Sequence, residues 1–382
     1  IVVFTVAVAV LDDGDDRMTA SERADYRDEA DRFLKVVGGM ADCEWTQAQH
    51  QWMSERNRSK LCTTEAGRAE LRLFDDTPLL MDGRKKDTQG RDGAEQVNAE
   101  YIRALSVRSG NPIASLKALH DHPSDMKNLA SWSSDDFRGL QSCLELCEGA
   151  RVLLTQNLWV EAGLMNGALG YVRGFMWPEG GDPASEFSKY ATPLCVIVEF
   201  DDVKMGVDAQ RRARSFFPDH PERARWVPIY AQKVNAQGEE PVIREQFPIV
   251  LAWAFTHWKA QGMTLLRERV RLGKRGAATL GVGFVAMTRV GHYRRLIFDI
   301  DLPDWEVFQG AQYSRKFRER RRFTLRTQVK ASTTVRKYRF CEVDLWSLED
   351  AAIADMMLVG LRAVGERQRA TQMQTGRCFD AD

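Results

Sequence analysis

The stretch that decides the fold lies at residues 252–265 and reads AWAFTHWKAQGMTL. Its apolar first half predicts a strand that ends in polar residues beside a glycine. These are Thr256, His257, Lys259 and Gln261, beside Gly262. Polar groups where a strand meets a loop can reach phosphate or base edges, and glycine lets a backbone come close to a ligand. Taken alone, the segment is most simply interpreted as a strand followed by an ordinary polar loop.

A second stretch, at residues 281–290, reads GVGFVAMTRV and brings an arginine to the end of an apolar run. The run predicts a buried strand from Leu280 to Met287, with Arg289 just beyond it. A guanidinium can fork onto phosphate oxygens and stabilise the charge of a transferring phosphoryl group. For a lone arginine a structural salt bridge is the commoner role, and both interpretations stay open at this point.

A third stretch reads GARVLLTQNL at residues 149–158 and continues as GLMNGALG at residues 163–170. Two apolar runs flank a turn in which Asn166-Gly167 is a strong hairpin signal. Short apolar runs and turn-rich segments alternate over the whole region from residue 150 to residue 250. The runs are Arg151–Thr155, Leu169–Met176, Leu194–Phe200, Trp226–Tyr230 and Phe247–Trp253. Several short strands at this spacing predict a small barrel.

The region before residue 150 is mainly helical in the spacing of its apolar residues. Capping-box spacing at Thr19–Glu22 begins a helix that runs to Gly38, and a second helix carries Val97–Leu105. Between them, Leu79–Met81 predicts a short strand. A further helix is predicted where apolar residues again recur at helical intervals, at Leu140, Cys143, Leu144 and Cys147.

Composition narrows the class of protein. The 382 residues are 44% hydrophobic and 9% aromatic, which is enough for two or three folded domains and excludes a disordered chain. Seven cysteines without CxxC spacing argue against a disulfide scaffold and against a zinc site, and no metal ligands are predicted. The apolar run Ile1–Leu11 is shorter than the roughly 20 residues that a membrane span needs, so no membrane partner is predicted.

Charge is unevenly distributed along the chain although the formal net charge is zero. Residues 1–150 hold 19 basic and 27 acidic residues, whereas residues 251–340 hold 20 basic and 6 acidic residues. The basic portion could hold a polyanion. It includes a tail in which Phe317 and Phe323 lie among arginines. For that tail, phosphate binding and a solvated helix face are equally good interpretations.

Taken in order, the three stretches resemble the ATP-dependent DNA helicases of the Pif type, in the RecD-like branch of the superfamily-one helicases. That family has a GARVMLTxNL…GLxNGxxG block, a later AxTIHKxQGxTL block and a final VALSRV block. This chain keeps their order, their spacing and most of their letters, including the Arg-x-Gln-Phe-Pro lead-in at Arg244–Pro248. The resemblance is strong over residues 145–300. It extends more weakly back to Leu79, where Lys85-Lys86 and Asn98 resemble the family's polar strand end and following helix.

The resemblance implies an α/β fold. The implied domain is the second RecA-like domain of a helicase, a P-loop NTPase-like fold with a parallel sheet. An SH3-like β-barrel is expected to be inserted in it. The first RecA-like domain is absent, and the start at Ile1, inside an apolar run, leads us to expect a fragment. The expected divisions are a truncated opening strand and helices at 1–60, the first part of the second RecA-like domain at 61–145, the barrel at 146–248, the remainder of that domain at 249–310 and a basic C-terminal extension at 311–382.

The family's functional residues carry over position by position. Arg289 matches an arginine finger that reaches the γ-phosphate of ATP across the interdomain cleft. Gln261 and Gly262 match the segment that couples the nucleotide state to the DNA, which makes these three the catalytic candidates. Thr256 and Lys259 match positions near the DNA strand. The full predicted DNA-binding set is Asn98, Asn157, Asn166, Gly167, Thr256, His257, Trp258 and Lys259.

One departure from the family concerns the histidine of the central block. Where the family has Ile-His-Lys, this chain has His257-Trp258-Lys259. A shift of one residue in an extended segment turns a side chain to the opposite face, so His257 does not inherit the family's histidine role. Trp258 can instead stack on a base, which contributes about 1–3 kcal/mol in single-strand binders, or it can pack in the core.

The second departure concerns ATP and Mg²⁺, the cofactors that the resemblance implies. No G-x-x-x-x-G-K-[ST] motif occurs in the chain, and no acidic box follows a strand that could hold Mg²⁺. We therefore expect the C-terminal part of a helicase, inactive alone. The complete enzyme would move 5′ to 3′ on single-stranded DNA and unwind duplex ahead of it.

The resemblance also implies partners and a cellular setting. The expected partners are single-stranded DNA and forked duplex DNA, with no membrane and no obligatory protein partner. DNA repair, recombination and telomere maintenance, inside the cell in the nucleus or mitochondrion, are the expected roles. Two alternatives stay open. One is a non-catalytic single-strand-binding protein derived from such helicases, and the other is a subunit that supplies Arg289 in trans to a separate ATPase. The presence of Arg289 and Gln261 favours the helicase.

Overall fold

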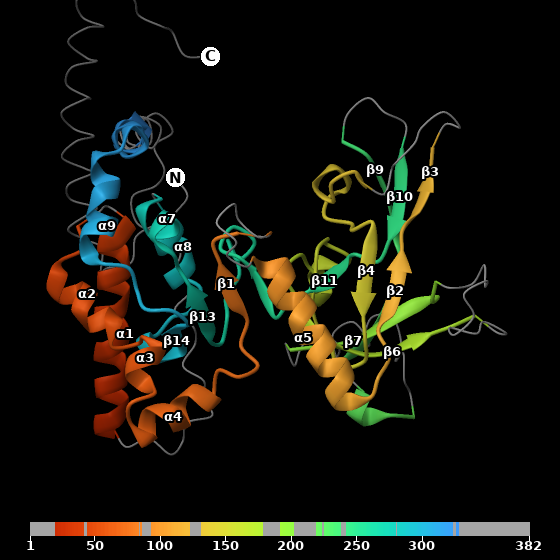
Figure 1. The fold of residues 1–382 in the computed structure, drawn as a ribbon, viewed down its shortest axis with the longest axis horizontal. Coiled ribbons are helices and arrows are strands. Elements are labelled where there is room, and N and C mark those ends of the chain that lie inside the picture. Colours follow the sequence, from red (N-terminus) through yellow and green to blue (C-terminus); the bar gives the residue numbers. More distant parts are fainter. Residues whose placement is uncertain are drawn as a thin grey trace, which may run out of the picture. The chain divides into compact units, whose positions relative to one another are not determined.

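The structure is a computed structural model that describes residues 20–41, 44–83, 85, 93–122, 131–178, 192–201, 219–223, 225–237, 242–279, 281–323 and 326–327 (Figure 1). By its internal contacts the chain divides into two units, residues 7–308 and residues 1–6 with 309–382. In the second unit, residues 315–323 are helical. The predicted opening strand lies outside the described residues. Among the helices that are described, none combines the length and the apolar character that a membrane crossing requires.

The secondary structure is mixed. The helices of the described residues are α1 (Ala20–Ala41), α2 (Gln47–Ser54), α3 (Arg58–Leu61), α4 (Glu65–Arg72), α5 (Ala94–Ser109), α7 (Lys274–Ala278), α8 (Val282–Met287) and α9 (Trp305–Gly310). The strands are β1 (Leu79–Met81), β2 (Ala114–Lys117), β3 (Leu119–Asp121), β4 (Cys143–Leu146), β5 (Arg151–Leu154), β6 (Leu169–Met176), β7 (Cys195–Phe200), β8 (Trp226–Ile229), β9 (Gln232–Asn235), β10 (Ile243–Gln246), β11 (Ile249–Leu251), β12 (Ala254–Thr256), β13 (Glu268–Arg271) and β14 (Leu296–Phe298).

A four-stranded parallel sheet has the strand order β12-β1-β13-β14. Leu80 of β1 faces a core that it shares with α1 and with Met287 of α8. Its neighbours Leu79 and Met81 face the other way, where Val97 of α5 covers them. This alternation puts α1 and α8 on one face of the sheet and α5 on the opposite face (Figure 1). The α/β class, the strand β1 and the helix α5 are confirmed as predicted.

A five-stranded antiparallel sheet has the strand order β11-β5-β6-β7-β8. Its core includes Val152, Val172 and Val196, together with Ile102 of α5. The strands of this sheet are the five that the sequence predicts between residues 150 and 253, so their existence is confirmed. The strand β11 belongs to this sheet although it follows residue 248. The identification of this region as an SH3-like barrel stays a prediction, as do the five domain boundaries.

The two smaller sheets lie in the same part of the sequence. The strands β2 and β4 form an antiparallel pair, and β10 lies between β3 and β9. Behind β10, Arg244 is fully buried and donates to the backbone oxygen of Leu140 at 2.9 Å, while its guanidinium lies 3.9 Å from the ring centre of Phe137. Its Nε also donates to Nε2 of His120 on β3 at 2.9 Å, so the side chain ties β10 to the neighbouring segments.

The predicted strand from Leu280 to Met287 is wrong. Val282–Met287 form the helix α8, which begins after Gly281 in the left-handed conformation, with φ of 83°. The helix is buried, so its residues are apolar in an unbroken run. Such a run has no period that separates a buried strand from a short buried helix. A Cβ on Gly283 would lie 2.6 Å from Cε of Met40, so this glycine lets α8 approach α1 closely.

The helix predicted around Cys143 and Cys147 is also wrong. Cys143–Leu146 form the strand β4, in which exposed and buried residues alternate. Leu144 and Leu146 point into the core, and Glu145 points out. The spacing of the leucines and cysteines fits a helical period as well as a period of two, and pairing with β2 selects the period of two.

Candidate nucleic-acid interface

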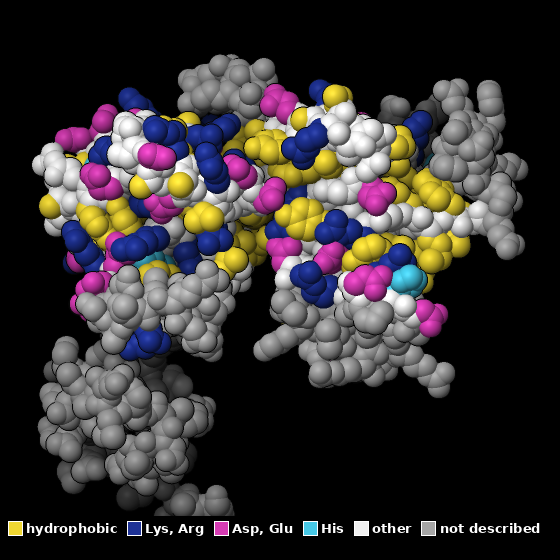
Figure 2. Space-filling view, turned by 90° about the horizontal axis from the view of Figure 1, so that it is seen from below, with side chains coloured by type: hydrophobic (Ala, Val, Ile, Leu, Met, Phe, Trp, Pro, Cys, Tyr) yellow, Lys and Arg dark blue, Asp and Glu magenta, His cyan; other side chains and the backbone are white. Residues whose placement is uncertain are grey.

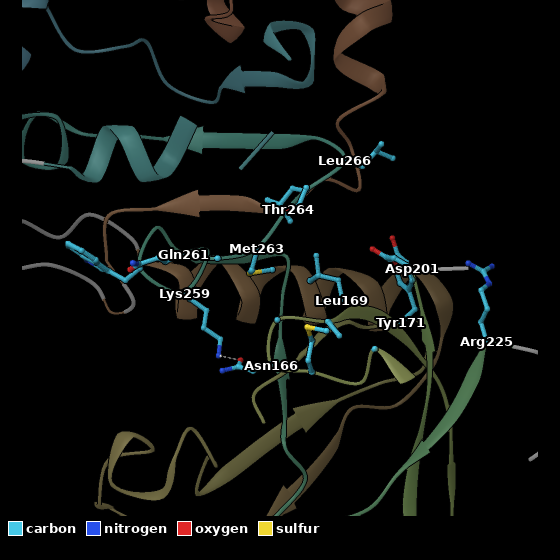
Figure 3. A pocket seen from close by; sticks show the side chains of 17 residues that line it. Asn166, Leu169, Tyr171, Asp201, Arg225, Lys259, Gln261, Met263, Thr264 and Leu266 are labelled. Atoms are coloured by element: carbon cyan, nitrogen blue, oxygen red, sulfur yellow. Dashed lines mark hydrogen bonds between the residues drawn. The ribbon is translucent and has the colours of Figure 1, made fainter. Parts of the chain in front are cut away.

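A groove of about 1120 Å³ lies where the turn after β12 meets the turn between β5 and β6 (Figure 3). Segments 163–171 and 258–266 form most of its lining, and Asp201 and Arg225 complete it. The lining is partly polar and partly apolar, with Lys259 and Arg225 as its basic residues and Asp201 as its acidic one. Figure 2 shows one face of the molecule, on which basic and acidic side chains are interspersed rather than segregated.

Lys259 and Asn166 bring two of the three predicted stretches together. The ammonium group of Lys259 donates to Oδ1 of Asn166 at 2.8 Å, as the dashed line in Figure 3 shows. The backbone N–H of Asn166 in turn donates to Oδ1 of Asn157 at 2.8 Å, and that of Lys259 donates to Oγ1 of Thr256 at 3.2 Å. Partial burial lowers the pKa of the Lys259 ammonium. An ammonium with three donors near a groove can add a phosphate oxygen to the asparagine it already contacts.

Gly167 and Gly262 shape the two turns. Gly262 has φ of +85° and Gly167 has φ of +101°, conformations that L side chains rarely adopt. A Cβ on Gly167 would lie 3.2 Å from Cγ of Met263, so the two turns are in direct contact at this point. Gln261, beside Gly262, is exposed on the wall of the groove. Six predicted site residues line this one cavity: Asn166, Gly167, Trp258, Lys259, Gln261 and Gly262.

Trp258 and His257 point into different surroundings, as the shifted register predicts. The indole of Trp258 is 58% exposed and lines the groove. The imidazole of His257 is only 1% exposed, and its Nε2 lies 3.2 Å from Oδ1 of Asp82. The sequence left Trp258 open between stacking on a base and packing in the core, and its exposure places it at the surface. His257 was placed in the DNA-binding set, and this needs correction, because a buried ring beneath the surface has no access to a ligand.

Asn98 needs the same correction. Its Oδ1 accepts the backbone N–H of Ala254 at 2.8 Å, and its Nδ2 donates to the oxygen of the same residue at 2.8 Å. A further bond runs to the oxygen of Leu251 at 3.3 Å. The side chain therefore fastens α5 to the strand β12 and is buried. An amide whose donors and acceptor are all used by the backbone has nothing left for a nucleic acid.

Arg289 holds the turn that carries Gln261 and Gly262. Its guanidinium is 7% exposed and donates to the oxygen of Met263 at 3.2 Å and to that of Ala260 at 3.4 Å. Nε donates to the oxygen of Val285 at 2.9 Å. The backbone oxygen of Arg289 also accepts the N–H of Leu265 at 2.8 Å. In this conformation the arginine is a clamp on residues 260–265, and its predicted role as a finger stays a prediction.

Glu268, at the start of β13, is missing from the predicted site. Its side chain is fully buried, and among the described residues neither carboxylate oxygen has a hydrogen-bond partner. Burial raises the pKa of this carboxyl well above its ordinary value, and the nearby guanidinium of Arg289 only partly opposes that effect. A period of two across residues 267–272 places Glu268 on the same face as Val270 and Leu272, and that alternation could have identified it.

Asp82, at the end of β1, is also missing from the predicted site. Besides its contact with His257, its Oδ2 accepts the backbone N–H of Gly273 at 2.9 Å. A Cβ on Gly276 would lie 2.1 Å from Oδ1 of the same carboxylate. The aspartate thus ties the ends of β1 and β12 to the start of α7, and Gly276 leaves the space that this contact needs.

The described residues show no ready-made cluster of metal ligands. They include no group of three or more histidine, cysteine, aspartate or glutamate side chains that could hold a metal ion. The guanidinium of Arg289, the expected contact for a γ-phosphate, is taken up by carbonyl oxygens of its own domain. The polar groups around the groove include two amides, an ammonium and an indole, together with the guanidinium of Arg225 and the carboxylate of Asp201. Such groups suit a sugar-phosphate strand and its bases.

Comparison with known proteins identifies relatives of one kind. The ATP-dependent DNA helicase PIF1 of Homo sapiens is 33% identical over 159 residues, which are 41% of this chain and 20% of that protein. The ATP-dependent DNA helicase PIF1 of Mus musculus is 29% identical over 212 residues, which are 55% of this chain and 26% of that protein. No established protein-family profile matches the chain.

Solved structures of Pif1 helicases superpose on part of this chain. The crystal structure of Pif1 helicase from Candida albicans superposes with a TM-score of 0.48 at 18% identity, over 77% of this chain and 58% of that one. Bacteroides Pif1 bound to single-stranded DNA superposes with a TM-score of 0.43 at 17% identity, over 72% of this chain and 50% of that one. The chain spans between a fifth and about a quarter of the length of the curated relatives.

Proposed function

Over the segment that they share, this chain is a relative of the PIF1-type ATP-dependent DNA helicases, and from that premise we propose that it is the part of such a helicase that holds single-stranded DNA. The complete enzyme would move 5′ to 3′ and open forked duplex ahead of it, in the nucleus or the mitochondrion. In this proposal the parallel sheet belongs to the second RecA-like domain, and the antiparallel sheet to the inserted barrel. ATP and Mg²⁺ would be held by residues other than those described.

One observation carries the proposal. The groove brings Lys259 and Trp258 of one turn together with Asn166 of another, although more than ninety positions separate them in sequence. A cation for a phosphate, an amide for a sugar or base edge and an exposed indole for stacking are the groups from which single-strand grooves are built. The relatives are DNA helicases by name, which supports DNA as the strand.

Substitution of Trp258 by alanine tests the groove directly. We expect affinity for a labelled oligothymidylate to fall by about 1–3 kcal/mol, the usual contribution of a stacked base. The slope of log affinity against log salt should stay unchanged, because an indole releases no counterions. Lys259→Gln should instead make that slope shallower by about 0.7, the value for one phosphate contact on a single strand. Fluorescence anisotropy at several salt concentrations measures both quantities.

The matched control is Tyr230→Ala, because Tyr230 is 56% exposed and does not line the groove. It should bind the oligonucleotide as well as the unaltered chain does. Equal losses from Trp258→Ala and Tyr230→Ala would mean that the indole is not a stacking platform, and the groove would lose its assignment.

We further propose that this chain alone does not hydrolyse ATP. The support is the lack of a phosphate-cradling G-x-x-x-x-G-K-[ST] motif in the sequence, and the lack of a metal-holding cluster among the described residues. Phosphate release measured with and without single-stranded DNA should therefore stay at background while oligonucleotide binding is retained. The same result is expected for a non-catalytic strand-binding protein, the second candidate. DNA-stimulated turnover would show a nucleotide site within the chain and would contradict this part of the proposal.

A further inference from the structure

The unit that contains residues 309–382 includes a short, strongly basic helix. Residues 315–323 are helical, and six of these nine residues are lysine or arginine, whereas one is acidic. Ser314 begins the helix, because its Oγ accepts the backbone N–H of Phe317 at 3.1 Å and its backbone oxygen accepts that of Arg318 at 3.3 Å. We call residues 315–323 the basic helix. Its cations are Arg315, Lys316, Arg318, Arg320, Arg321 and Arg322.

The cations of the basic helix lie on opposite sides of it. Successive residues of an α-helix are turned by about 100° around its axis. Arg315, Arg318 and Arg322 therefore form one row. Lys316 and Arg320 form a second row, roughly 150° around the helix from the first. The side chains of both rows are exposed.

The basic helix presents no apolar face. Phe317 and Phe323 are its only apolar residues, and they lie about 120° apart around the axis. Phe323 is 70% exposed. A helix that lies on a membrane needs its apolar residues gathered on one side, so the basic helix does not have the form of a membrane-surface helix.

The charges of the basic helix oppose its own formation. Two pairs of like charges stand four residues apart, of which Lys316 and Arg320 are one, and like charges at this spacing destabilise a helix. An attractive pair of the same spacing joins Nε of Arg315 to Oε1 of Glu319 at 2.7 Å, but both side chains are more than half exposed. Helices of fewer than about 12–15 residues are marginal in water. An anion that neutralises both rows would therefore stabilise the basic helix.

We propose that the basic helix binds in the major groove of duplex DNA, with one row of cations on the phosphates of each wall. The major groove is about 12 Å wide, and an α-helix with its side chains is about 10–12 Å across, so the helix fits with phosphates on both sides. A single strand or a flat anionic surface would meet one row and leave the other in water.

The same geometry favours DNA over RNA. The major groove of duplex RNA is deep and narrow and does not admit side chains in this way. Contacts to phosphates do not depend on base sequence, so the basic helix is expected to bind duplex DNA of any sequence. This inference goes beyond the proposed function, whose groove holds a single strand, and does not depend on it.

Two double variants of the full chain test the rows separately. Arg318→Gln/Arg322→Gln lowers the charge of one row and Lys316→Gln/Arg320→Gln that of the other, and glutamine is a helix former as good as arginine or lysine. With a blunt, labelled duplex, each variant should make the slope of log affinity against log salt shallower by about 1.8, which is about 0.9 for each lost phosphate contact. If variant and unaltered chain bind equally at 1 M salt, this corresponds to about a 60-fold loss of affinity at 0.1 M salt.

The matched control is Arg23→Gln/Arg27→Gln. These two arginines have the same spacing as each pair in the basic helix, and both are exposed on the helix α1. Fluorescence anisotropy at several salt concentrations should give the slope of the unaltered chain. If the control lost as much duplex affinity as the two other double variants, the duplex would respond only to the general charge of the chain, and the proposal would be overturned.

The two kinds of DNA separate this proposal from the proposed function. Both variants of the basic helix should bind a short oligothymidylate normally, and Trp258→Ala should bind the duplex normally. Normal duplex binding by both double variants, beside a loss of oligothymidylate binding in Trp258→Ala, would overturn the basic helix and leave the groove intact. Duplex losses in both double variants, beside normal oligothymidylate binding in Trp258→Ala, would overturn the groove and support the basic helix.

Two further outcomes count against the major groove. A loss in only one of the two double variants would mean that the helix contacts a polyanion from one side. Equal competition by a duplex RNA of the same sequence would mean that the contact does not need the wide groove of DNA. The expected result is a loss in both double variants, with duplex RNA the weaker competitor.

Discussion

Arg289→Met is expected to destabilise the fold by about 1–3 kcal/mol, and to release the turn at residues 260–265. The guanidinium donates to three backbone oxygens, those of Ala260, Met263 and Val285. Methionine fills a similar volume but donates nothing, so the oxygen of Met263 loses its partner, whereas those of Ala260 and Val285 keep the bonds that they accept from Met263 N–H and from Thr288 Oγ1. Each buried group left unpaired costs about 1–3 kcal/mol. The cost is concentrated on one turn, and that turn carries Gln261 and the groove.

Urea unfolding and amide hydrogen exchange measure this prediction together. The midpoint should fall, and the amides of Met263 and Leu265 should exchange faster than those of the sheet, because they bond to Ala260 and to Arg289 itself. The control is Arg294→Met, since Arg294 is exposed and pairs with Glu29 at 2.7 Å. An exposed pair contributes about 0–1 kcal/mol. If the two variants lost the same stability, Arg289 would not be a clamp.

The hydrogen bonds of Arg289 to the turn limit its predicted role as an arginine finger. Before its guanidinium could reach a phosphate, Arg289 would have to leave the oxygens of Ala260 and Met263, and the turn would lose its support at the same moment. A finger and a clamp are therefore linked: the position of one side chain decides both whether a phosphate is contacted and whether the groove keeps its wall. In a complete helicase this would couple Arg289 to Gln261, which is the coupling that the family resemblance implies for that segment.

The helical spacing of α5 has an unambiguous period, and the predicted helix is confirmed. The apolar run Leu79–Met81 has no period, but it is too short for a helix of ordinary length, and the predicted strand is confirmed as β1. The run at α8 is apolar throughout, and no period remained to separate strand from helix. For α8, tertiary packing decides between strand and helix, because the sheet and α1 fix the space that α8 fills.

The candidate site divides in the same way. Local sequence placed Lys259 in a polar segment after a strand and Asn166 in a turn, and the structure brings the two together. It left Trp258 open between the surface and the core. Asn98 and His257 carry the right chemistry for a ligand, but the structure uses that chemistry internally, on Ala254 and Asp82. Whether a polar side chain serves a ligand or the backbone depends on partners that are distant in sequence, and no local pattern reveals them.

Glu268→Gln is expected to stabilise the protein at neutral and alkaline pH. Burial raises the pKa of the Glu268 carboxyl in the folded state, whereas in the unfolded chain it titrates near its ordinary value of about 4.3. Between those two values the folded protein binds more protons than the unfolded protein. Its stability therefore falls as pH rises through that interval, by about 1.4 kcal/mol for each pH unit. Glutamine is neutral at every pH, so the variant lacks this loss.

His292 also makes the stability depend on pH, so the effect of Glu268 has to be measured as a difference between the variant and the unaltered chain. Burial lowers the pKa of His292 to about 4 although the hydrogen bond to the backbone oxygen of Tyr26 opposes that effect, so the folded state binds fewer protons than the unfolded state between that value and about 6.5. This group therefore makes stability rise with pH in the window where Glu268 makes it fall. The two opposing slopes conceal each other in the unaltered chain. The difference between Glu268→Gln and the unaltered chain cancels the histidine and isolates the carboxyl.

The measurement is the free energy of unfolding from urea curves at pH values between 4 and 9. The difference in favour of Glu268→Gln should be near zero at the acidic end and grow steadily as pH rises, until the folded carboxyl has ionised. Glu306→Gln, which alters an exposed carboxyl on α9, should give no such trend. A constant difference at all pH values would mean that Glu268 is ionised throughout and paired with Arg289, and the clamp would then be a buried ion pair. A growing difference instead means that burial keeps the carboxyl protonated in the folded state over the interval in which the difference grows, and that Arg289 holds the turn there through its carbonyl contacts.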